Sequence, residues 1–404
     1  MNEPSRFRPP FRLLSTRRRA LLAGLFVFAA AVTVGTARPS GDRDGPPDGQ
    51  DVFRYDTFGD ERQWTDQLKM HAVIQQSLDP VTALSLGLKV DADALPEGLL
   101  GSLTPDQLAD PQTTLALIKL DAVVGVKGRV EADEDGKLSL ARVGITCALC
   151  HSTVDNSVAA GIGRRLDGWP NRDLDPGAII AASPAVGEAA KRVYRSWGPG
   201  RYDPRFNIDG LSTPVLIPPA YGLDGVRRAT YTGDGDISYW NNYVAVTQMG
   251  GQGVFIDRRI GVKEVRTPDL VHRVLRPLRE YQLELEPPAP SEGSFDPDQA
   301  AAGKALFHGA AQCAKCHSGP LYTDAPRGKL HAPAETGTDP AYANRSATGK
   351  YRTTPLRGVW QHPPYFHDGS AATLADVVEH YDQVLRLNLT VDQKADLVEF
   401  LKSL

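Results

Sequence analysis

The chain has 404 residues, of which 41% are hydrophobic and 23% charged, and its formal net charge is −4. This composition excludes a largely disordered chain and a multi-span membrane protein, and the length suffices for two domains with separate cores. Residues 1–37 contain six Arg and one Glu, a net charge of +5, so the chain without them carries −9. Because such an acidic protein repels phosphate backbones, we expect no nucleic-acid partner.

Residues 1–37 have the pattern of an export signal. Six Arg residues precede an uncharged apolar run, Ala20–Ala37, and small residues at Thr36-Ala37 provide a cleavage point. The run lies at the short end of what spans a bilayer, so two alternatives stay open: a cleaved signal peptide or an N-terminal membrane anchor. Both predict an exported protein of the periplasm or cell envelope, either soluble after cleavage or associated with the membrane.

A linker and a large first domain are predicted to follow. Residues 38–60 are predicted to be a flexible linker, since Gly, Pro and Asp dominate its first half. The first domain is predicted over 61–286. It begins with a helix over 61–79, where apolar residues recur every three or four positions. Pro199–Gly261 is rich in Gly, Pro, Asn and Asp, which predicts long structured loops.

Two apolar runs, Ala122–Val126 and Leu138–Ile145, are separated by the turn residues 133–136. This pattern predicts a strand pair that leads directly into the first of two unusual motifs.

Two Cys-x-x-Cys-His motifs, Cys147–His151 and Cys313–His317, contain every cysteine of the chain. Thiols at this spacing can form thioethers to the vinyl groups of a haem, and the adjacent histidine then becomes the proximal iron ligand. A disulfide or a zinc site is the alternative, but zinc prefers four ligands and each motif offers three. Behind an export signal and with no spare thiol, the motifs predict two covalently bound haem c groups. The predicted attachment residues are Cys147, Cys150, Cys313 and Cys316, and the predicted iron ligands are His151 and His317.

Residues 287–295 are rich in Pro, Ser and Gly and predict a second linker, and residues 296–404 predict a compact helical domain. Asp296 before Pro297 predicts a helix start, and Thr373 and Thr390 predict the caps of two further helices. The predicted fold class is therefore mainly α, with two cytochrome c-like haem domains, long loops and a small β element before the first haem motif.

The second predicted domain closely resembles the C-terminal domain of bacterial di-haem cytochrome c peroxidases. The resembling segments are Gly303–Phe307, Ser318–Asp324, Tyr351–Val359, Pro364–Ser370, Thr373-Leu374 and Leu397–Leu401, in the family's order. In the first domain the resemblance is limited to the haem motif and a loop that runs from Leu211 through Tyr231–Gly235 to Gly250. Residues 61–146 have no counterpart in the peroxidases.

The superfamily also contains the di-haem enzyme of methylamine utilisation and the rubber-cleaving oxygenases. The resemblance therefore implies haem redox chemistry with peroxide or dioxygen, without fixing the substrate. It also implies a calcium ion between the domains, for which the Thr354-Pro355 segment is compatible.

The resemblance places the distal ligand of the second haem at Tyr381. A tyrosinate oxygen would stabilise the ferric state more than a methionine sulfur does. Two alternatives stay open. His380 is a rival ligand one residue away, and Tyr381 can simply pack on the apolar face of its helix.

At the first haem the peroxidases carry a distal glutamate, and the corresponding residue here is Gln248. Glutamine can hydrogen-bond a peroxide but cannot transfer its proton as a carboxylate can. Met249 is predicted either as a thioether ligand that closes this haem or as core filler. His71 is a further candidate ligand, and His367 is predicted to orient the second pocket. The histidines predicted to be structural or exposed are His272, His308, His331 and His362.

These features favour an exported haem oxidoreductase. Electrons would pass through the second haem from or to a small redox protein, while peroxide or a related oxidant would bind at the first. The alternative is an electron-transfer cytochrome with both irons six-coordinate, and a third hypothesis is an oxygenase or protein-modifying enzyme. Spectra that count the open iron positions distinguish these hypotheses.

Overall fold

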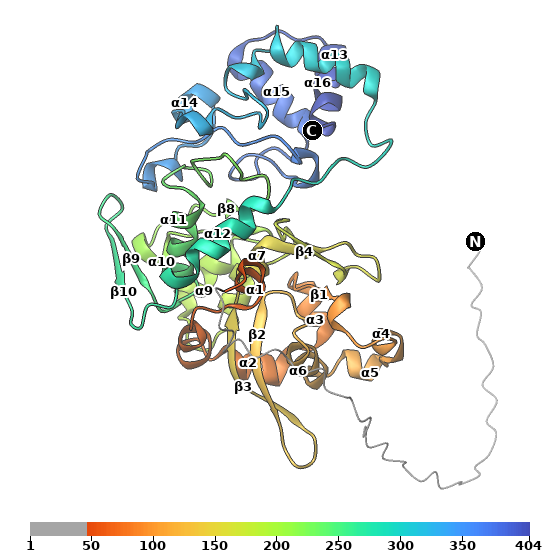
Figure 1. Ribbon diagram of the computed structural model, residues 1–404, viewed down its shortest axis with the longest axis vertical. Coiled ribbons are helices and arrows are strands. Elements are labelled where there is room, and N and C mark those ends of the chain that lie inside the picture. Colours follow the sequence, from red (N-terminus) through yellow and green to blue (C-terminus); the bar gives the residue numbers. More distant parts are fainter. Residues whose placement is uncertain (1–46) are drawn as a thin grey trace, which may run out of the picture. The chain divides into compact units, whose positions relative to one another are not determined.

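The structure is a computed structural model that describes residues 47–404. The predicted signal or anchor and the start of the first predicted linker lie outside these residues. Within the described part, no helix is long and apolar enough to cross a membrane. The described residues form a mainly helical fold with small two-stranded sheets and long connecting loops (Figure 1). The predicted fold class is therefore confirmed.

The first region, residues 47–286, holds short helices around the first haem motif. Its α-helices are α1 Gly49–Tyr55, α2 Met70–Ser77, α3 Pro80–Ser85, α4 Leu99–Ser102, α5 Pro105–Leu108, α6 Pro111–Lys119, α7 Ala148–His151, α8 Pro176–Ala181, α9 Glu188–Arg195, α10 Phe206–Asp209, α11 Ile237–Tyr243 and α12 Leu275–Glu284. Two π-helices span Arg62–Gln67 and Val244–Gln248, and 3-10 turns span Ala92–Ala94 and His272–Val274.

The strands of the first region pair two by two. Antiparallel pairs join β2 Val126–Ala132 to β3 Leu138–Ile145, β4 Ser152–Val154 to β6 Arg165–Asp167, β7 Arg201–Tyr202 to β8 Val215–Leu216, and β9 Val254–Asp257 to β10 Val262–Val265. A short parallel pair joins β1 Val90–Asp91 to β5 Ile162–Gly163.

The second region, residues 296–404, contains three longer helices around the second motif. They are α13 Pro297–His308, α15 Leu374–Leu385 and α16 Val391–Lys402, with the short α14 Pro333–Thr336 and 3-10 turns at Cys313–Lys315, Ala325–Arg327, Ala343–Arg345 and Val359–Gln361. Asp296, Thr373 and Thr390 each accept a backbone N–H at the start of their helix, which confirms the three predicted caps.

Helices α13 and α16 pack side by side (Figure 1). A Cβ at Gly303 of α13 would lie 1.9 Å from the carbonyl oxygen of Asp396 on α16, so only glycine allows this approach. Phe307 and Phe400 meet edge to face across the contact, with ring centroids 5.1 Å apart. Side chains of this helix pair line the cavity that contains the second motif.

Some predicted elements differ from the structure. Gly49–Tyr55, inside the predicted flexible linker, forms α1, because Val52 and Phe53 are buried in the core. The predicted helix over 61–79 is divided at Lys69, whose φ of 58° is left-handed; the turn allows Trp64 and Met70, on either side of it, both to be buried.

The first predicted strand, Ala122–Val126, is also displaced. Strand β2 begins only at Val126, because Gly125 (φ +76°) turns the chain against α7, where a Cβ would lie 2.1 Å from the backbone nitrogen of Leu149. Within the predicted loops of Pro199–Gly261, the continuous helical segment from Ile237 to Gln248 was not predicted. This segment carries part of the candidate site.

Candidate haem sites

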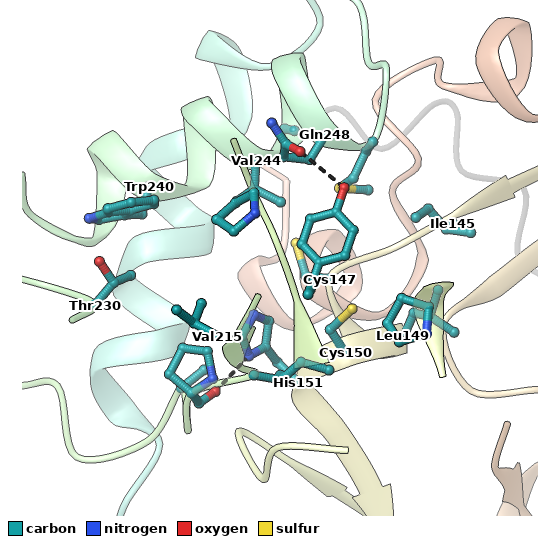
Figure 2. Close-up of a pocket in the computed structure, with 18 of the residues that line it drawn as sticks. Ile145, Cys147, Leu149, Cys150, His151, Val215, Thr230, Trp240, Val244 and Gln248 are labelled. Carbon is teal, nitrogen blue, oxygen red and sulfur yellow. Dashed lines mark hydrogen bonds between the residues drawn. The ribbon is translucent and has the colours of Figure 1, made fainter. Parts of the chain in front are cut away.

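The first motif lies in a cavity of about 280 Å³, here called the first cavity. His151 lies on one side of this cavity, and Trp240, Val244 and Gln248 lie on the other (Figure 2). Most of the lining is aliphatic or aromatic, and no aspartate or glutamate of the described residues contributes to it. An apolar lining with a few polar groups, among them the guanidinium of Arg352, suits a large planar aromatic ligand.

The second motif lies in a cavity of about 270 Å³, the second cavity. Helices α13, α15 and α16 line it with apolar side chains, and Tyr381 projects from α15 into it. Imidazole and carboxylate groups are more frequent here than around the first motif. The imidazoles of this lining are those of His317, His331, His362 and His367, and its carboxylate is that of Glu335.

Both motif histidines are oriented by a backbone carbonyl. His151 Nδ1 lies 3.0 Å from the Pro218 oxygen, and His317 Nδ1 lies 2.9 Å from the Tyr322 oxygen. A carbonyl can only accept, so each Nδ1 carries the proton and each Nε2 keeps its lone pair. Metal-bound histidines are held in this way in proteins, because the second hydrogen bond fixes both tautomer and ring orientation.

Burial keeps these groups neutral. Desolvation lowers the pKa of His151 to about 4 and also lowers that of His317, which favours the uncharged, ligating form of each imidazole. Burial likewise raises the pKa of Cys147 to about 12 and that of Cys313 to about 11. Two neutral thiols and a neutral imidazole with a free Nε2, facing an apolar cavity, fit a haem attached through thioethers.

Gln248 ends the π-helix Val244–Gln248 and lines the first cavity. Its Oε1 accepts a hydrogen bond of 3.0 Å from the Tyr202 hydroxyl (Figure 2). Its Nε2 donates to Thr247 Oγ1 over 2.8 Å. Tyr202 was not singled out in the sequence. Its position opposite Gln248 depends on a contact across 46 residues that no local pattern records.

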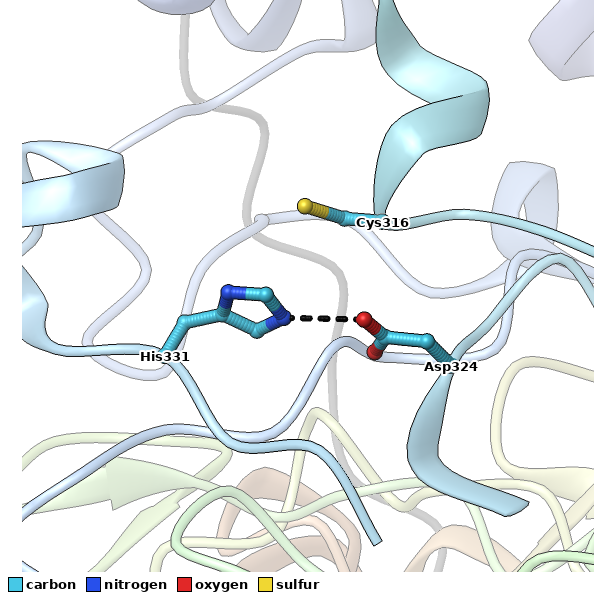
Figure 3. Close-up of side chains that lie close together, drawn as sticks. All are labelled: Cys316, Asp324 and His331. Atoms are coloured by element: carbon cyan, nitrogen blue, oxygen red, sulfur yellow. Dashed lines mark hydrogen bonds and ion pairs between the residues drawn. The ribbon is translucent and has the colours of Figure 1, made fainter. Parts of the chain in front are cut away.

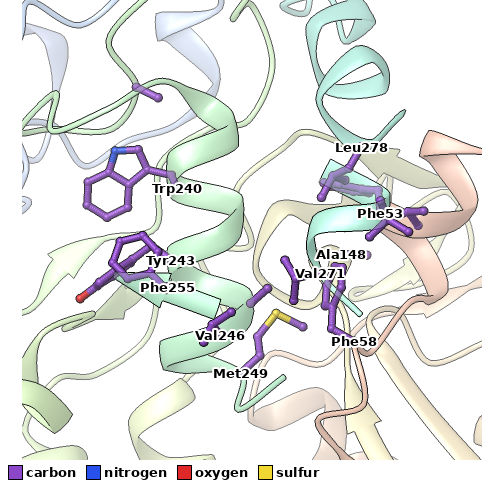
Figure 4. Close-up of a cluster of buried hydrophobic side chains, with 14 of the residues drawn as sticks. Phe53, Phe58, Ala148, Trp240, Tyr243, Val246, Met249, Phe255, Val271 and Leu278 are labelled. Atoms are coloured by element: carbon purple, nitrogen blue, oxygen red, sulfur yellow. The ribbon is translucent and has the colours of Figure 1, made fainter. Parts of the chain in front are cut away.

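Met249 lines the first cavity and also belongs to the buried core cluster around Phe58, Val246 and Val271 (Figure 4). The two alternatives for this residue, ligand and core filler, are therefore both compatible with its place, and iron ligation stays a prediction. His71 does not line either cavity, and its buried Nδ1 has no hydrogen-bond partner in the structure.

The side chains of Tyr381 and His380 have different contacts: Tyr381 lines the second cavity, and His380 does not. His380 Nε2 lies 2.7 Å from the Thr336 carbonyl oxygen, and this residue does not line the second cavity. Tyr381 does line it, and burial next to the motif cysteines raises the pKa of its phenol to about 12. Of the two neighbours, Tyr381 is the one placed to meet a bound group, although its ligation stays a prediction.

The remaining histidines divide into two groups. His272 and His308 are exposed, and His272 pairs with Asp269. His331, His362 and His367 line the second cavity. His367 Nε2 lies 3.0 Å from the Tyr351 hydroxyl, and its ring stacks on that of Tyr351.

Cys316, Asp324 and His331 form the one group of potential metal ligands found among the described residues (Figure 3). His331 Nε2 is already hydrogen-bonded to Asp324 Oδ2 over 3.1 Å, and the ligand atoms are spread over as much as 4.8 Å. Because Cys316 belongs to the second motif, a zinc ion here would compete with the thioether. The arrangement fits an ordinary buried His–Asp pair beside the haem attachment point.

Residues 61–146, for which the sequence predicted no counterpart in the peroxidases, contribute directly to the first cavity. Gln63, Trp64 and Leu68 line it, and the Trp64 indole donates a hydrogen bond of 3.0 Å to the Met249 carbonyl. In the sequence, the regular spacing of the apolar residues Trp64 and Leu68 indicated that this segment packs against a core.

Thr354 and Pro355, compatible with the predicted calcium ion, line a third cavity together with Asp224 and Glu286. Segments of both regions and the intervening linker therefore meet there. The calcium ion itself stays a prediction.

Parts of the chain are similar to known cytochrome c proteins. A family model described as RoxA-like, cytochrome c-like, matches residues 349–384. The cytochrome-c peroxidase IdrP1 of Denitromonas iodatirespirans is 30% identical over 26% of this chain and 40% of the relative. The cytochrome-c peroxidase IdrP2 of Pseudomonas sp. (strain SCT) is 25% identical over 65% of this chain and 76% of the relative. A solved structure of a MauG-like protein associated with microbial copper homeostasis has a TM-score of 0.35 at 18% identity, covering 48% of this chain and 74% of that one.

The mainly helical fold and the matched family model define a protein with a cytochrome c-like domain, which implies haem c. The sequence relatives are cytochrome c peroxidases, so the chain is similar to the di-haem cytochrome c peroxidase superfamily, as the motif resemblance predicted. The chain spans about two fifths of the length of IdrP1, so the activity of that whole protein does not transfer by similarity alone.

Proposed function

We propose that this protein is an exported di-haem c-type cytochrome that reduces peroxide or a related small oxidant. Peroxide would bind at the haem held by His151, and single electrons would arrive from a small redox protein through the haem held by His317. The observation that carries the proposal is the lining of the first cavity. His151 is its single imidazole among the described residues, so no second histidine is available to close that iron.

A haem bound in the first cavity supplies the one-electron and oxygen chemistry, and the protein supplies position and protons. Gln248, on the wall opposite His151, is hydrogen-bonded to Tyr202, which also lines the cavity. Burial raises the pKa of Tyr202 well above its usual range, so its hydroxyl keeps its proton at neutral pH. The pair can therefore hold a peroxide by hydrogen bonds, although it lacks the carboxylate that would transfer a proton efficiently.

Tyr381 is the proposed distal ligand in the second cavity. A hard oxygen donor there would leave that haem six-coordinate and suited to electron transfer rather than to binding small molecules. The different functions proposed for the two haems therefore depend on which protein atom would bind each iron.

Export is proposed because covalent haem attachment at Cys-x-x-Cys-His motifs follows export, and because residues 1–37 have a signal-like pattern. The same segment leaves the choice between a periplasmic protein and a membrane-anchored one to experiment. Calcium at the third cavity is part of the proposal, with Asp224 and Glu286 as the nearby carboxylates.

The test is spectroscopic. The purified protein should contain two haems per chain, one high-spin and one low-spin in the ferric optical and electron paramagnetic resonance spectra. Peroxide should change only the high-spin signals, and a reduced small cytochrome should then be oxidised in a peroxide-dependent reaction. Two low-spin haems that do not react with peroxide would contradict the proposal.

Met249 supports a second candidate function, an electron-transfer cytochrome with both irons six-coordinate. Its side chain lines the first cavity and offers the thioether sulfur that such a site requires. If carbon monoxide binds neither reduced haem and Met249→Leu opens the first haem to it, this candidate is favoured over the peroxidase.

A further inference from the structure

Arg172 and Arg352 are two partly buried arginines whose buried guanidinium nitrogens have no acidic partner in the structure. Neither takes part in a salt bridge among residues 47–404. Arg172 Nε and Nη1 and Arg352 Nε are buried and lack any hydrogen-bond partner. Other buried arginines are matched: Arg205 pairs with Asp234 over 2.6 Å, and Arg345 pairs with Asp203 over 2.8 Å.

Both arginines border the candidate haem sites. Arg352 lines the first and the second cavity, and Arg172 lines the second. The two cavities also share Pro218, Pro219 and Tyr231, so these residues and Arg352 form a common wall.

Backbone contacts hold the two side chains at this wall. Arg352 Nη1 donates to the Arg228 carbonyl over 3.0 Å, and its backbone N–H donates to the Tyr231 carbonyl over 2.8 Å. Arg172 Nη2 donates to the His362 carbonyl over 3.2 Å. Arg172 Nε and Nη1 and Arg352 Nε are thus left for a ligand at the cavity wall.

Burial of these two guanidinium groups favours the binding of an anionic ligand. Burial lowers the pKa of Arg352 to about 10 and also lowers that of Arg172, and the groups that oppose this effect are tyrosines rather than carboxylates. Buried charges without a counter-charge are strongly destabilising in proteins. The protein alone does not supply that counter-charge.

A haem carries two propionate carboxylates, and planar guanidinium groups bind carboxylates in bidentate geometry. We propose that Arg352 and Arg172 are the propionate-binding residues of this protein. Arg352 binds a carboxylate of each haem and so joins the two sites, whereas Arg172 binds the second haem. This inference rests on the proposed function, because it requires both haems.

The assignment predicts how the two haems respond to substitution. A guanidinium beside a haem stabilises the ferrous state, which carries less positive charge than the ferric state. Loss of Arg352 should therefore lower the reduction potentials of both haems, whereas loss of Arg172 should lower only that of the second.

The experiment is an optical redox titration of the haem-loaded protein and its variants. Arg352→Gln should disfavour reduction of both haems by tenfold or more in the one-electron equilibrium constant, about 59 mV or more. Arg172→Gln should have this effect on the second haem alone, and the two Lys variants should stay closer to the parent because they keep the charge. Arg357→Gln is the matched control, since Arg357 is exposed, bonds the Pro320 carbonyl and lines neither haem cavity.

Haem content is measured on every variant, so that two kinds of failure are distinguished. A parent protein without two haems would contradict the proposed function. A protein with two haems whose potentials do not change in Arg352→Gln would overturn the propionate assignment alone. A change at only one haem in that variant would overturn the bridging role of Arg352. If a Gln variant does not fold, the corresponding Lys variant still tests the assignment through the hydrogen-bond-sensitive propionate modes in its resonance Raman spectrum, which should change relative to Arg357→Gln.

Discussion

The two haem cavities are built around the same pentapeptide pattern but differ in their opposite walls. In the first, Gln248, Tyr202 and the indole of Trp240 face the cavity, and Trp240 Nε1 is buried without a partner. In the second, Tyr381 faces the cavity amid three histidines besides His317 and one glutamate. Under the proposed function, the motif would fix haem attachment and the proximal ligand, whereas the surrounding elements would determine what each iron can do.

The scaffolds of the two walls differ as well. The first wall comes from a π-helix, where one extra residue per turn displaces side chains, and π-helical turns are frequent at functional sites. The second comes from the regular, capped helix α15. The irregular wall is thus at the site proposed to bind small molecules, and the regular helix carries the proposed permanent ligand, Tyr381.

The largest effect should come from removing one attachment site at a time. Cys147→Ala with Cys150→Ala should abolish covalent haem at the first site and all reaction with peroxide, because the oxidant-binding iron is lost. Cys313→Ala with Cys316→Ala is the matched variant, which should keep the high-spin signal but lose electron supply from a reduced cytochrome. Mass spectrometry and stopped-flow kinetics measure both. If the first double variant still reacts with peroxide, the roles of the cavities are reversed.

Substitution of the proposed iron ligand should distinguish the role of Tyr381 from that of its neighbour His380. Tyr381→Phe should convert the second haem from low-spin to high-spin, because the oxygen donor is removed while packing on α15 is kept. His380→Phe is the control, since His380 is bonded to Thr336 and lies outside the cavity lining. Electron paramagnetic resonance of the ferric proteins provides the measurement. An unchanged spectrum in Tyr381→Phe would remove Tyr381 as a ligand.

A carboxylate in the first cavity should increase the difference in peroxide reactivity between the two cavities. Gln248→Glu should increase the rate of peroxide reduction by about 100-fold, because a positioned carboxylate contributes roughly 10² to 10⁴ as a general acid–base catalyst. Gln248→Leu should reduce the rate, and Thr247→Val, which removes the hydroxyl that accepts from the Gln248 amide and donates to the Tyr243 carbonyl, should have a smaller effect. If the rate of peroxide reduction is equal in all three variants, Gln248 does not occupy the site of proton transfer.

What the sequence predicted correctly is local in character. The caps at Asp296, Thr373 and Thr390 depend on residues within one turn, and the two motifs depend on five consecutive positions. Both motifs lie in the cavities expected of haem sites, although the attachment and ligand residues themselves stay predictions.

What was missed depends on contacts between distant segments. The bond from Tyr202 to Gln248 and the shared wall at Arg352 join residues far apart in the chain, so no window of sequence contains them. Helix α1 was missed because a Gly- and Pro-rich segment precedes it, and its stability comes from burial of Phe53 against the rest of the fold.

The smallest expected effect concerns how the N-terminal segment supports the first cavity. Trp64 is 7% exposed and donates to the Met249 carbonyl, next to Gln248. Trp64→Phe leaves that carbonyl unpartnered and should lower the free energy of unfolding by about 1 to 3 kcal/mol. Trp360→Phe is the matched control, because its indole bonds the Pro288 carbonyl over 3.2 Å at a partly buried position where water can replace it. Urea unfolding followed by haem absorbance should show the larger loss for Trp64→Phe, together with a changed first-haem spectrum and an unchanged second. Equal losses would mean that the segment packs beside the cavity without shaping it.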